Sequence, residues 1–176
     1  MRRVVRLVLV LLTFSAWLLG VSALVYAEDA AIVTNENFGV MLSVPQDWDL
    51  DARGEDAKVI ASFSQQKTAG KLELLGTRII RDEHALVMFD AFKEQLKANG
   101  FVTAVAAQEL EFGERKGSLE EFDFTSSEVT IRVIAFCFVE KSVAYAAVAY
   151  VSRADRERVR ESLEAMVLSL KAQSNS

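Results

Sequence analysis

The chain of 176 residues contains a single cysteine, a single histidine and a single proline. One cysteine, Cys137, excludes an internal disulfide, so core packing has to stabilise the fold. One proline and eight glycines leave little room for long linkers or low-complexity segments. The sequence also lacks a Gly-x-Ser-x-Gly elbow, a glycine-rich phosphate loop and a His-Glu-x-x-His zinc motif. Nothing among these common signatures indicates an enzyme or a cofactor.

Residues 1–27 have the three-part pattern of a secretory signal. A basic start is followed by an uncharged apolar run, residues 7–19, and Val25 and Ala27 occupy the −3 and −1 positions of a cleavage site. The alternative is an uncleaved anchor helix, because the apolar run extended to residue 25 is nearly long enough to span a bilayer. The sequence therefore predicts a periplasmic or secreted protein that meets a membrane only through residues 1–27, if they are retained.

The part that follows the signal is acidic. Of the 20 basic and 25 acidic residues, the signal holds three arginines and no acid, so the remaining 149 residues carry a net charge of −8. An acidic domain without a basic stripe is a poor ligand for a nucleic acid backbone or for anionic lipid. We therefore expect no nucleic acid partner, and a partner that is another protein of the envelope.

Residues 129–151 form the stretch around which the predicted fold is organised. Two apolar runs, 129–139 and 142–151, are separated at Glu140-Lys141-Ser142. The first run is rich in β-branched and aromatic residues, and the second interleaves Ala with Val and Tyr, as in strands that are covered on both faces. The short polar break indicates a hairpin, so we predict two adjacent antiparallel strands in the middle of a sheet.

The other segments are predicted to cover this ribbon. Two helices with apolar faces are expected at 82–99 and from Ser152, where Ser152 and Asp155 form a capping box. Because the strands come in runs, the fold class is α+β, with a mainly antiparallel sheet of six to seven strands packed against two helices. Further strands are expected at 38–44, 58–64, 71–80 (with a β-bulge or bend at Gly76), 101–112 and 118–126. They belong to a domain 38–171 that lies between a flexible start, 28–37, and a disordered tail, 172–176.

Two segments of the chain resemble a known family. FGVMLSVPQDW, residues 38–48, resembles the opening strand and Pro-x-x-Trp of the PsbP-like/Mog-like fold, and VRESLEAMVLSLK, residues 159–171, resembles its closing helix. The family includes photosystem assembly and oxygen-evolution subunits, a nuclear GTPase release factor and bacterial envelope proteins of the DcrB and LpqN type. The resemblance implies a non-enzymatic binding or assembly module of the cell envelope, and it carries over no catalytic residue.

Four acidic residues are the candidate cation ligands. If the hairpin of residues 113–117 is centred on Arg115, Glu109 lies opposite Glu121, on the face that also carries Glu111 and Asp123. Like charges directly opposite each other destabilise a sheet, so this face would suit calcium or a basic partner. The alternative is a hydrated strand face that is kept charged to prevent edge-to-edge pairing.

Cys137 and His84 are the remaining candidates for chemistry. His84 follows Asp82 and Glu83 at the start of a predicted helix, where consecutive side chains point in different directions, so we expect a solvated first turn and no metal site. Cys137 lies in a strand that is covered on both faces, as a small buried hydrophobe does. A small thiol-dependent hydrolase using Cys137 is the alternative function, and the reactivity of the thiol in the folded protein distinguishes the two.

Arginines open the last predicted helix. They could bind an anion, but acidic residues three or four positions away favour a solvent face held by ion pairs. The arginines are Arg153, Arg156, Arg158 and Arg160.

Overall fold

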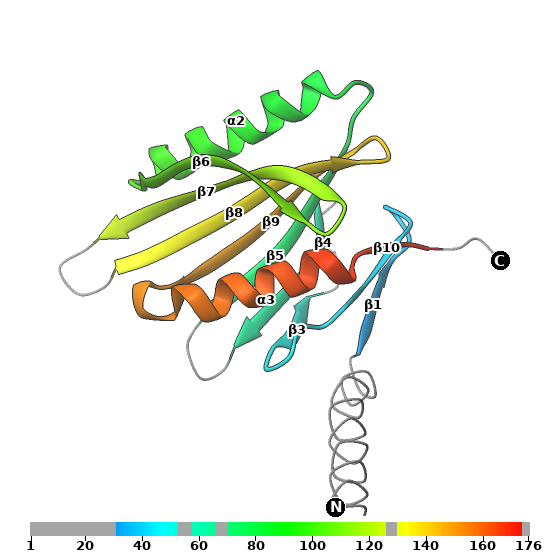
Figure 1. The fold of residues 1–176 in the computed structure, drawn as a ribbon, viewed down its shortest axis with the longest axis horizontal. Coiled ribbons are helices and arrows are strands. Elements are labelled where there is room, and N and C mark those ends of the chain that lie inside the picture. The colour runs from blue at the N-terminus through cyan, green and yellow to red at the C-terminus, as the bar shows by residue number, and fades with distance from the viewer. Residues whose placement is uncertain (1–30, 53–57, 66–69, 126–129, 174–176) are drawn as a thin grey trace, which may run out of the picture. The chain divides into compact units, whose positions relative to one another are not determined.

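The computed structural model describes residues 31–52, 58–65, 70–125 and 130–173 (Figure 1). The predicted signal sequence, with Val25 and Ala27, lies outside these residues, and its cleavage stays a prediction. None of the described helices is both long and apolar enough to cross a membrane.

The larger of the two sheets formed by the described residues has seven strands, and every neighbouring pair is antiparallel (Figure 1). The predicted α+β class is therefore confirmed. In spatial order the strands are β3 (Asp49–Ala52), β4 (Val59–Gln65), β5 (Gly70–Arg78), β9 (Val143–Ser152), β8 (Thr130–Glu140), β7 (Arg115–Thr125) and β6 (Val102–Phe112).

The predicted central hairpin is confirmed by β8 and β9, which pair along ten residue pairs in the interior of the sheet. Their two-residue turn, Lys141-Ser142, has φ angles of 49° and 60°, as a type I′ turn requires. Neither residue is a glycine, so the turn holds two side chains in a backbone region that is costly for L-residues. The Ser142 carbonyl accepts a hydrogen bond from the Ile79 amide at 2.9 Å, which ties the turn to the end of β5.

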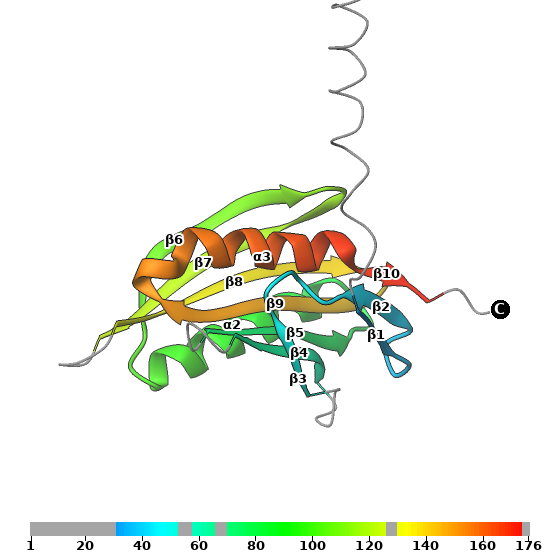
Figure 2. The ribbon, with the colours of Figure 1, turned by 90° about the horizontal axis from the view of Figure 1, so that it is seen from below.

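Two helices cover opposite faces of the large sheet (Figure 2). α2 (Glu83–Ala98) lies on one face, and α3 (Arg156–Ser169), preceded by the short 3-10 helix η1 (Arg153–Asp155), lies on the other. Side chains alternate between the faces of a strand, so the central strands contribute to both layers and have to be apolar on both. In β9, Tyr145, Ala147 and Ala149 share a core cluster with α3, whereas Ala146 and Val148 share one with Leu96 of α2.

The apolar stripe predicted for the last helix is confirmed, because all of its members are buried. They are Val159, Leu163, Met166, Val167 and Leu170.

The capping box differs from the prediction. The Ser152 hydroxyl donates to the Asp155 carboxylate at 2.7 Å, and neither side chain bonds a backbone amide. A 3-10 turn therefore separates Ser152 from the first residue of α3.

The end of α2 forms a Schellman motif. The Phe101 amide donates to the Leu96 carbonyl at 3.1 Å and the Gly100 amide to the Lys97 carbonyl at 2.9 Å, with Gly100 at φ 86°. On a helical wheel Leu86 falls in the apolar arc of the predicted helix 82–99, but its side chain is 65% exposed, so the prediction that it faces the sheet is wrong. Only the helix stripe containing Ala85 and Leu96 reaches the sheet closely enough to be buried.

A second, three-stranded sheet combines the two ends of the described chain. β1 (Ile32–Asn35), β2 (Val40–Ser43) and β10 (Lys171–Ala172) pair in the order β1-β2-β10. The flexible start predicted for residues 28–37 is wrong where β1 lies, and the first residue of the disordered tail predicted at 172–176 belongs to β10. Both strands are too short for a periodic pattern. β1 forms a hairpin with β2, which follows it in the sequence, whereas β10 pairs with β2 from the other end of the described chain.

Gly76 of β5 makes room for a bulge in β4. Val59 pairs with Leu75 and Ala61 with Leu74, so Ile60 is the extra residue. A Cβ at Gly76 would lie 2.6 Å from Ile60 Cδ1 and 3.0 Å from Phe38 Cε1, so the surrounding side chains would have to move. The bulge predicted in β5 itself is wrong, because β5 pairs with β9 without a register shift. The glycine instead accommodates the side chain of the bulged neighbour.

Candidate functional site

A groove lies between the small sheet and the C-terminal half of α3. It is an open depression with a volume of about 390 Å³. Two large apolar side chains on its rim are exposed, Ile32 to 65% and Leu168 to 46%. The groove is lined by Ile32, Met41, Leu42, Ser43, Ala165, Leu168, Ser169 and Lys171.

The walls of the groove are joined through Ser169. Its hydroxyl accepts a hydrogen bond from the Ser43 amide at 3.1 Å and donates to the Met166 carbonyl at 2.8 Å, so the last turn of α3 is held against β2. The turn between β6 and β7 borders the groove at Leu168, because a Cβ on Gly113 would lie 2.9 Å from Leu168 Cδ2. Arg115 of β7 donates to the Leu170 carbonyl at 2.6 Å and thereby caps α3.

The chemistry of the groove is that of a binding surface. Lys171 is the only ionisable side chain among the lining residues, and the Ser169 hydroxyl is already engaged within the fold. Apolar surface left in water is unfavourable by about 25 cal/mol per Å², so a ligand that covers Ile32 and Leu168 gains free energy. The lining offers no pair of groups for acid–base or nucleophilic catalysis.

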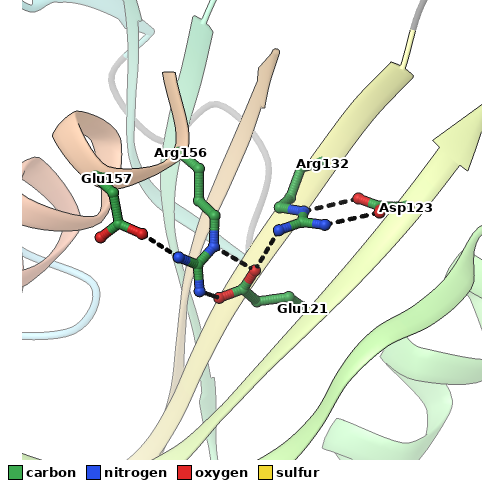
Figure 3. Close-up of polar contacts among 5 residues, drawn as sticks. All are labelled: Glu121, Asp123, Arg132, Arg156 and Glu157. Atoms are coloured by element: carbon green, nitrogen blue, oxygen red, sulfur yellow. Dashed lines mark hydrogen bonds and ion pairs between the residues drawn. The ribbon is translucent and has the colours of Figure 1, made fainter. Parts of the chain in front are cut away.

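A buried ion cluster lies at the other end of α3 (Figure 3). Glu121 of β7 has a side chain with no exposed surface. It accepts hydrogen bonds from Arg132 Nη1 of β8 at 3.0 Å and from Arg156 Nε and Nη2 at 2.8 and 2.5 Å. Asp123 accepts two more bonds from Arg132, both at 2.7 Å. Two carboxylates and two guanidinium groups thus pair inside the protein, and Glu157 contacts Arg156 from the solvent side.

Pairing within the cluster shifts the pKa values of Asp123, Arg132 and Arg156. The hydrogen bonds from Arg132 hold the pKa of Asp123 below its ordinary value. The hydrogen bonds to Asp123 and Glu121 raise the pKa values of Arg132 and Arg156 respectively. Asp123, Arg132 and Arg156 therefore stay charged at neutral pH, and the cluster fixes the start of α3 to β7 and β8. We interpret it as a structural clamp, since each charge already has a partner.

The register predicted for the β6–β7 hairpin is wrong. The tight turn closes at Gly113-Glu114, with Gly113 at φ 63°, and Phe112 pairs with Arg115. Glycine is favoured at the first central position of such a turn, so the turn lies earlier than the predicted centre at Arg115. Glu109 consequently pairs with Ser118 and not with Glu121.

The premise of the predicted cation site therefore does not hold. Glu121 and Asp123 are on the face that α3 covers, where Arg132 and Arg156 neutralise them. Glu109 and Glu111 are on the opposite face and exposed, and Glu111 pairs with Lys116 at 2.9 Å. No three His, Cys, Asp or Glu side chains of the described residues are grouped so that they could hold a metal ion.

Cys137 and His84 stay apart from the groove and from each other. His84 is exposed in the first turn of α2, and no hydrogen bond joins it to Cys137. Cys137 is packed against the α2-side core, and burial raises the pKa of its thiol to about 12. A thiol with that pKa is almost entirely protonated at neutral pH and is a weak nucleophile.

Sequence reasoning missed two features. The arginines expected to form a solvent face include Arg156, which instead reaches Glu121 inside the fold. Arg132 was available as a signal, because it has the same parity as Phe136 and Phe138 in β8 and so had to share their buried face. The groove had no local signal, since its rim residues Ile32 and Leu168 are far apart in the sequence.

No model of a protein family and no curated protein matches this sequence. Solved structures do match. The cyanobacterial PsbP of Synechocystis (CyanoP) is 10% identical, with a TM-score of 0.59 over 84% of this chain and 95% of that chain. LpqN of Mycobacterium tuberculosis is 10% identical, with a TM-score of 0.53 over 83% and 86% of the two chains. The Ran-binding protein Mog1p of Saccharomyces cerevisiae is 7% identical, with a TM-score of 0.54 over 84% and 97%.

The protein has the PsbP-like/Mog-like fold. A structure from Bacteroides thetaiotaomicron is similar as well, with 13% identity and a TM-score of 0.58, although this chain spans only 50% of that one. At these identities the likeness establishes the fold alone. The family resemblance of the opening strand and the closing helix is confirmed at that level, and a specific relation to the DcrB type stays a prediction.

Proposed function

We propose that the protein is an exported, non-enzymatic binding or assembly module of the cell envelope, and that the groove between the small sheet and α3 is its binding site. The observation that carries this proposal is the apolar groove itself, with Ile32 and Leu168 exposed on its rim. Exposed apolar side chains beside a recess are a common feature of protein interaction sites.

The N-terminal sequence supports export, because residues 1–27 have the pattern of a cleavable signal. The structural neighbours support a binding role: LpqN is involved in cell envelope biogenesis, and Mog1p binds Ran. The acidic character of the mature chain favours a protein partner over nucleic acid or anionic lipid.

The export part of the proposal is tested by the mass of the protein recovered from the envelope fraction of expressing cells. We expect a polypeptide that begins at Glu28. A mass that includes residues 1–27 would assign the protein to the alternative, a membrane-tethered assembly factor that uses the same groove. Recovery of the protein from the cytosol alone would contradict export.

A further inference from the structure

The edge of the small sheet beside the groove is open. β1 is an outer strand of that sheet and, within the described part of the chain, pairs only with β2. Backbone bonding alternates along an antiparallel pair. The Val44 amide donates to the Ala31 carbonyl at 2.8 Å, so the odd-numbered residues of β1 direct their backbone groups at β2. The amides and carbonyls of Ile32 and Thr34 therefore point away from the sheet, and both residues are exposed.

The other sheet edges carry charges with register shifts, or only two residues, whereas β1 carries no charge, proline or bulge. β3, at one edge of the large sheet, contains Asp49 and Asp51 and has a register shift. β6, at the other edge, contains Glu109 and Glu111 and has two register shifts. Charges, bulges and very short strands are the usual protections of an edge. β10 has only two residues, whereas β1 reads Ile-Val-Thr-Asn, without charge, proline or bulge.

We infer that the groove's occupant is an extended segment of the partner protein, which adds to β1 as a fourth strand of the small sheet. The inference rests on the proposed function and names the mode of recognition. Backbone groups of Ile32 and Thr34 provide the hydrogen bonds, and a strand is the only element whose backbone complements them in series. A large apolar side chain of the added strand, placed beside Ile32, covers the Ile32–Leu168 rim and enters the groove. Alternate positions of the partner segment are accordingly apolar.

The probe is a phage-displayed library of random peptides, panned on the exported protein. We expect enrichment of peptides with apolar residues at alternate positions. The variant Thr34→Pro removes one outward amide at an edge position where proline is tolerated, and it should weaken the selected peptides about tenfold. The matched control, Thr34→Val, keeps the amide and should bind as the parent does. Amide hydrogen exchange at Ile32 and Thr34 should slow in the peptide complex.

The outcomes separate this inference from the proposed function. Peptides that lose binding with Leu168→Glu but bind Thr34→Pro and Thr34→Val equally would overturn strand addition and leave the groove as the site. Selected peptides that neither substitution affects would contradict both. If Thr34→Pro does not fold, peptides methylated on alternate backbone nitrogens replace it, and unchanged binding of both methylated series would overturn the inference. Self-association of the protein that Thr34→Pro abolishes would assign the edge to a second copy and overturn it as well.

Discussion

Arg156 Nη2 lies 2.5 Å from Glu121 Oε1, although the two residues are 35 positions apart in the sequence and belong to α3 and β7. The carboxylate is fully buried, and a second guanidinium, that of Arg132, donates to it from β8. This contact holds the first residue of α3 against β7. It also places two of the four acidic residues that the sequence offered as cation ligands, Glu121 and Asp123, against arginines of the same chain.

The first prediction concerns Arg132. Arg132→Met should destabilise the protein by about 3–5 kcal/mol, because Glu121 would lose one of its partners and Asp123 the guanidinium that pairs with it. Urea unfolding measures the change. Lys116→Met is the matched control, since it removes one cation from the exposed pair with Glu111, and it should leave the unfolding midpoint almost unchanged. Equal effects of the two substitutions would contradict the clamp.

The second prediction concerns acid. Because the pKa of Asp123 is lower in the folded protein than its ordinary value, its pairing stabilises the fold above the unfolded pKa and is lost as the pH falls through the folded pKa. The free energy of unfolding should therefore decrease when the pH is lowered below about 4. Asp123→Asn should remove part of that decrease. Urea titrations at a series of pH values test this. A variant with the same pH dependence as the parent would show that the pair contributes nothing.

The third prediction concerns Gly76. Gly76→Ala should destabilise the protein by about 1–3 kcal/mol, since the new Cβ would lie 2.6 Å from Ile60 Cδ1. Ile60→Val removes that Cδ1 atom, so the double variant should be more stable than the sum of the two single changes implies. Purely additive effects in thermal unfolding would mean that the two side chains do not meet.

Parts of this fold could be predicted from local sequence patterns, and other parts could not. The β8–β9 hairpin and the buried stripe of α3 followed from local patterns that are long enough to be periodic. The β6–β7 register could not be predicted in this way, because it depends on where the tight turn closes. The turn closes at Gly113-Glu114 and not at the predicted centre, Arg115. β1 has only four residues, too few for a periodic pattern, and the groove depends on segments from opposite ends of the described chain.

The fourth prediction concerns the β8–β9 turn. Replacing Lys141-Ser142 by Asn-Gly should stabilise the protein by about 1 kcal/mol, because both positions have positive φ and Asn-Gly is the preferred pair in type I′ turns. Gly100→Ala is the opposite case: it places a side chain at φ 86°, with its Cβ 3.3 Å from Phe124 Cε2, and should destabilise. Differential scanning calorimetry measures both. A lower melting temperature for the Asn-Gly variant would show that the present turn is not strained.

The fifth prediction concerns Cys137. With a thiol pKa of about 12 in the folded protein, alkylation by iodoacetamide at pH 7.5 should be much slower than in urea, where the thiol pKa returns to about 8.5. Burial is the cause, so the native rate should follow the opening of the fold. Rapid labelling of the folded protein would contradict this prediction and would instead support the alternative function, a thiol-dependent hydrolase.

The groove is tested most directly by site-specific photo-crosslinking in the cells that export the protein. A photoreactive residue replaces Leu168 at the rim in one variant. In the control it replaces Val102, which is also exposed but lies in β6, at the edge of the large sheet. We predict a discrete adduct with one envelope protein from position 168 and none from position 102. Adducts from position 102 alone, or the same adducts from both positions, would contradict a binding site in the groove.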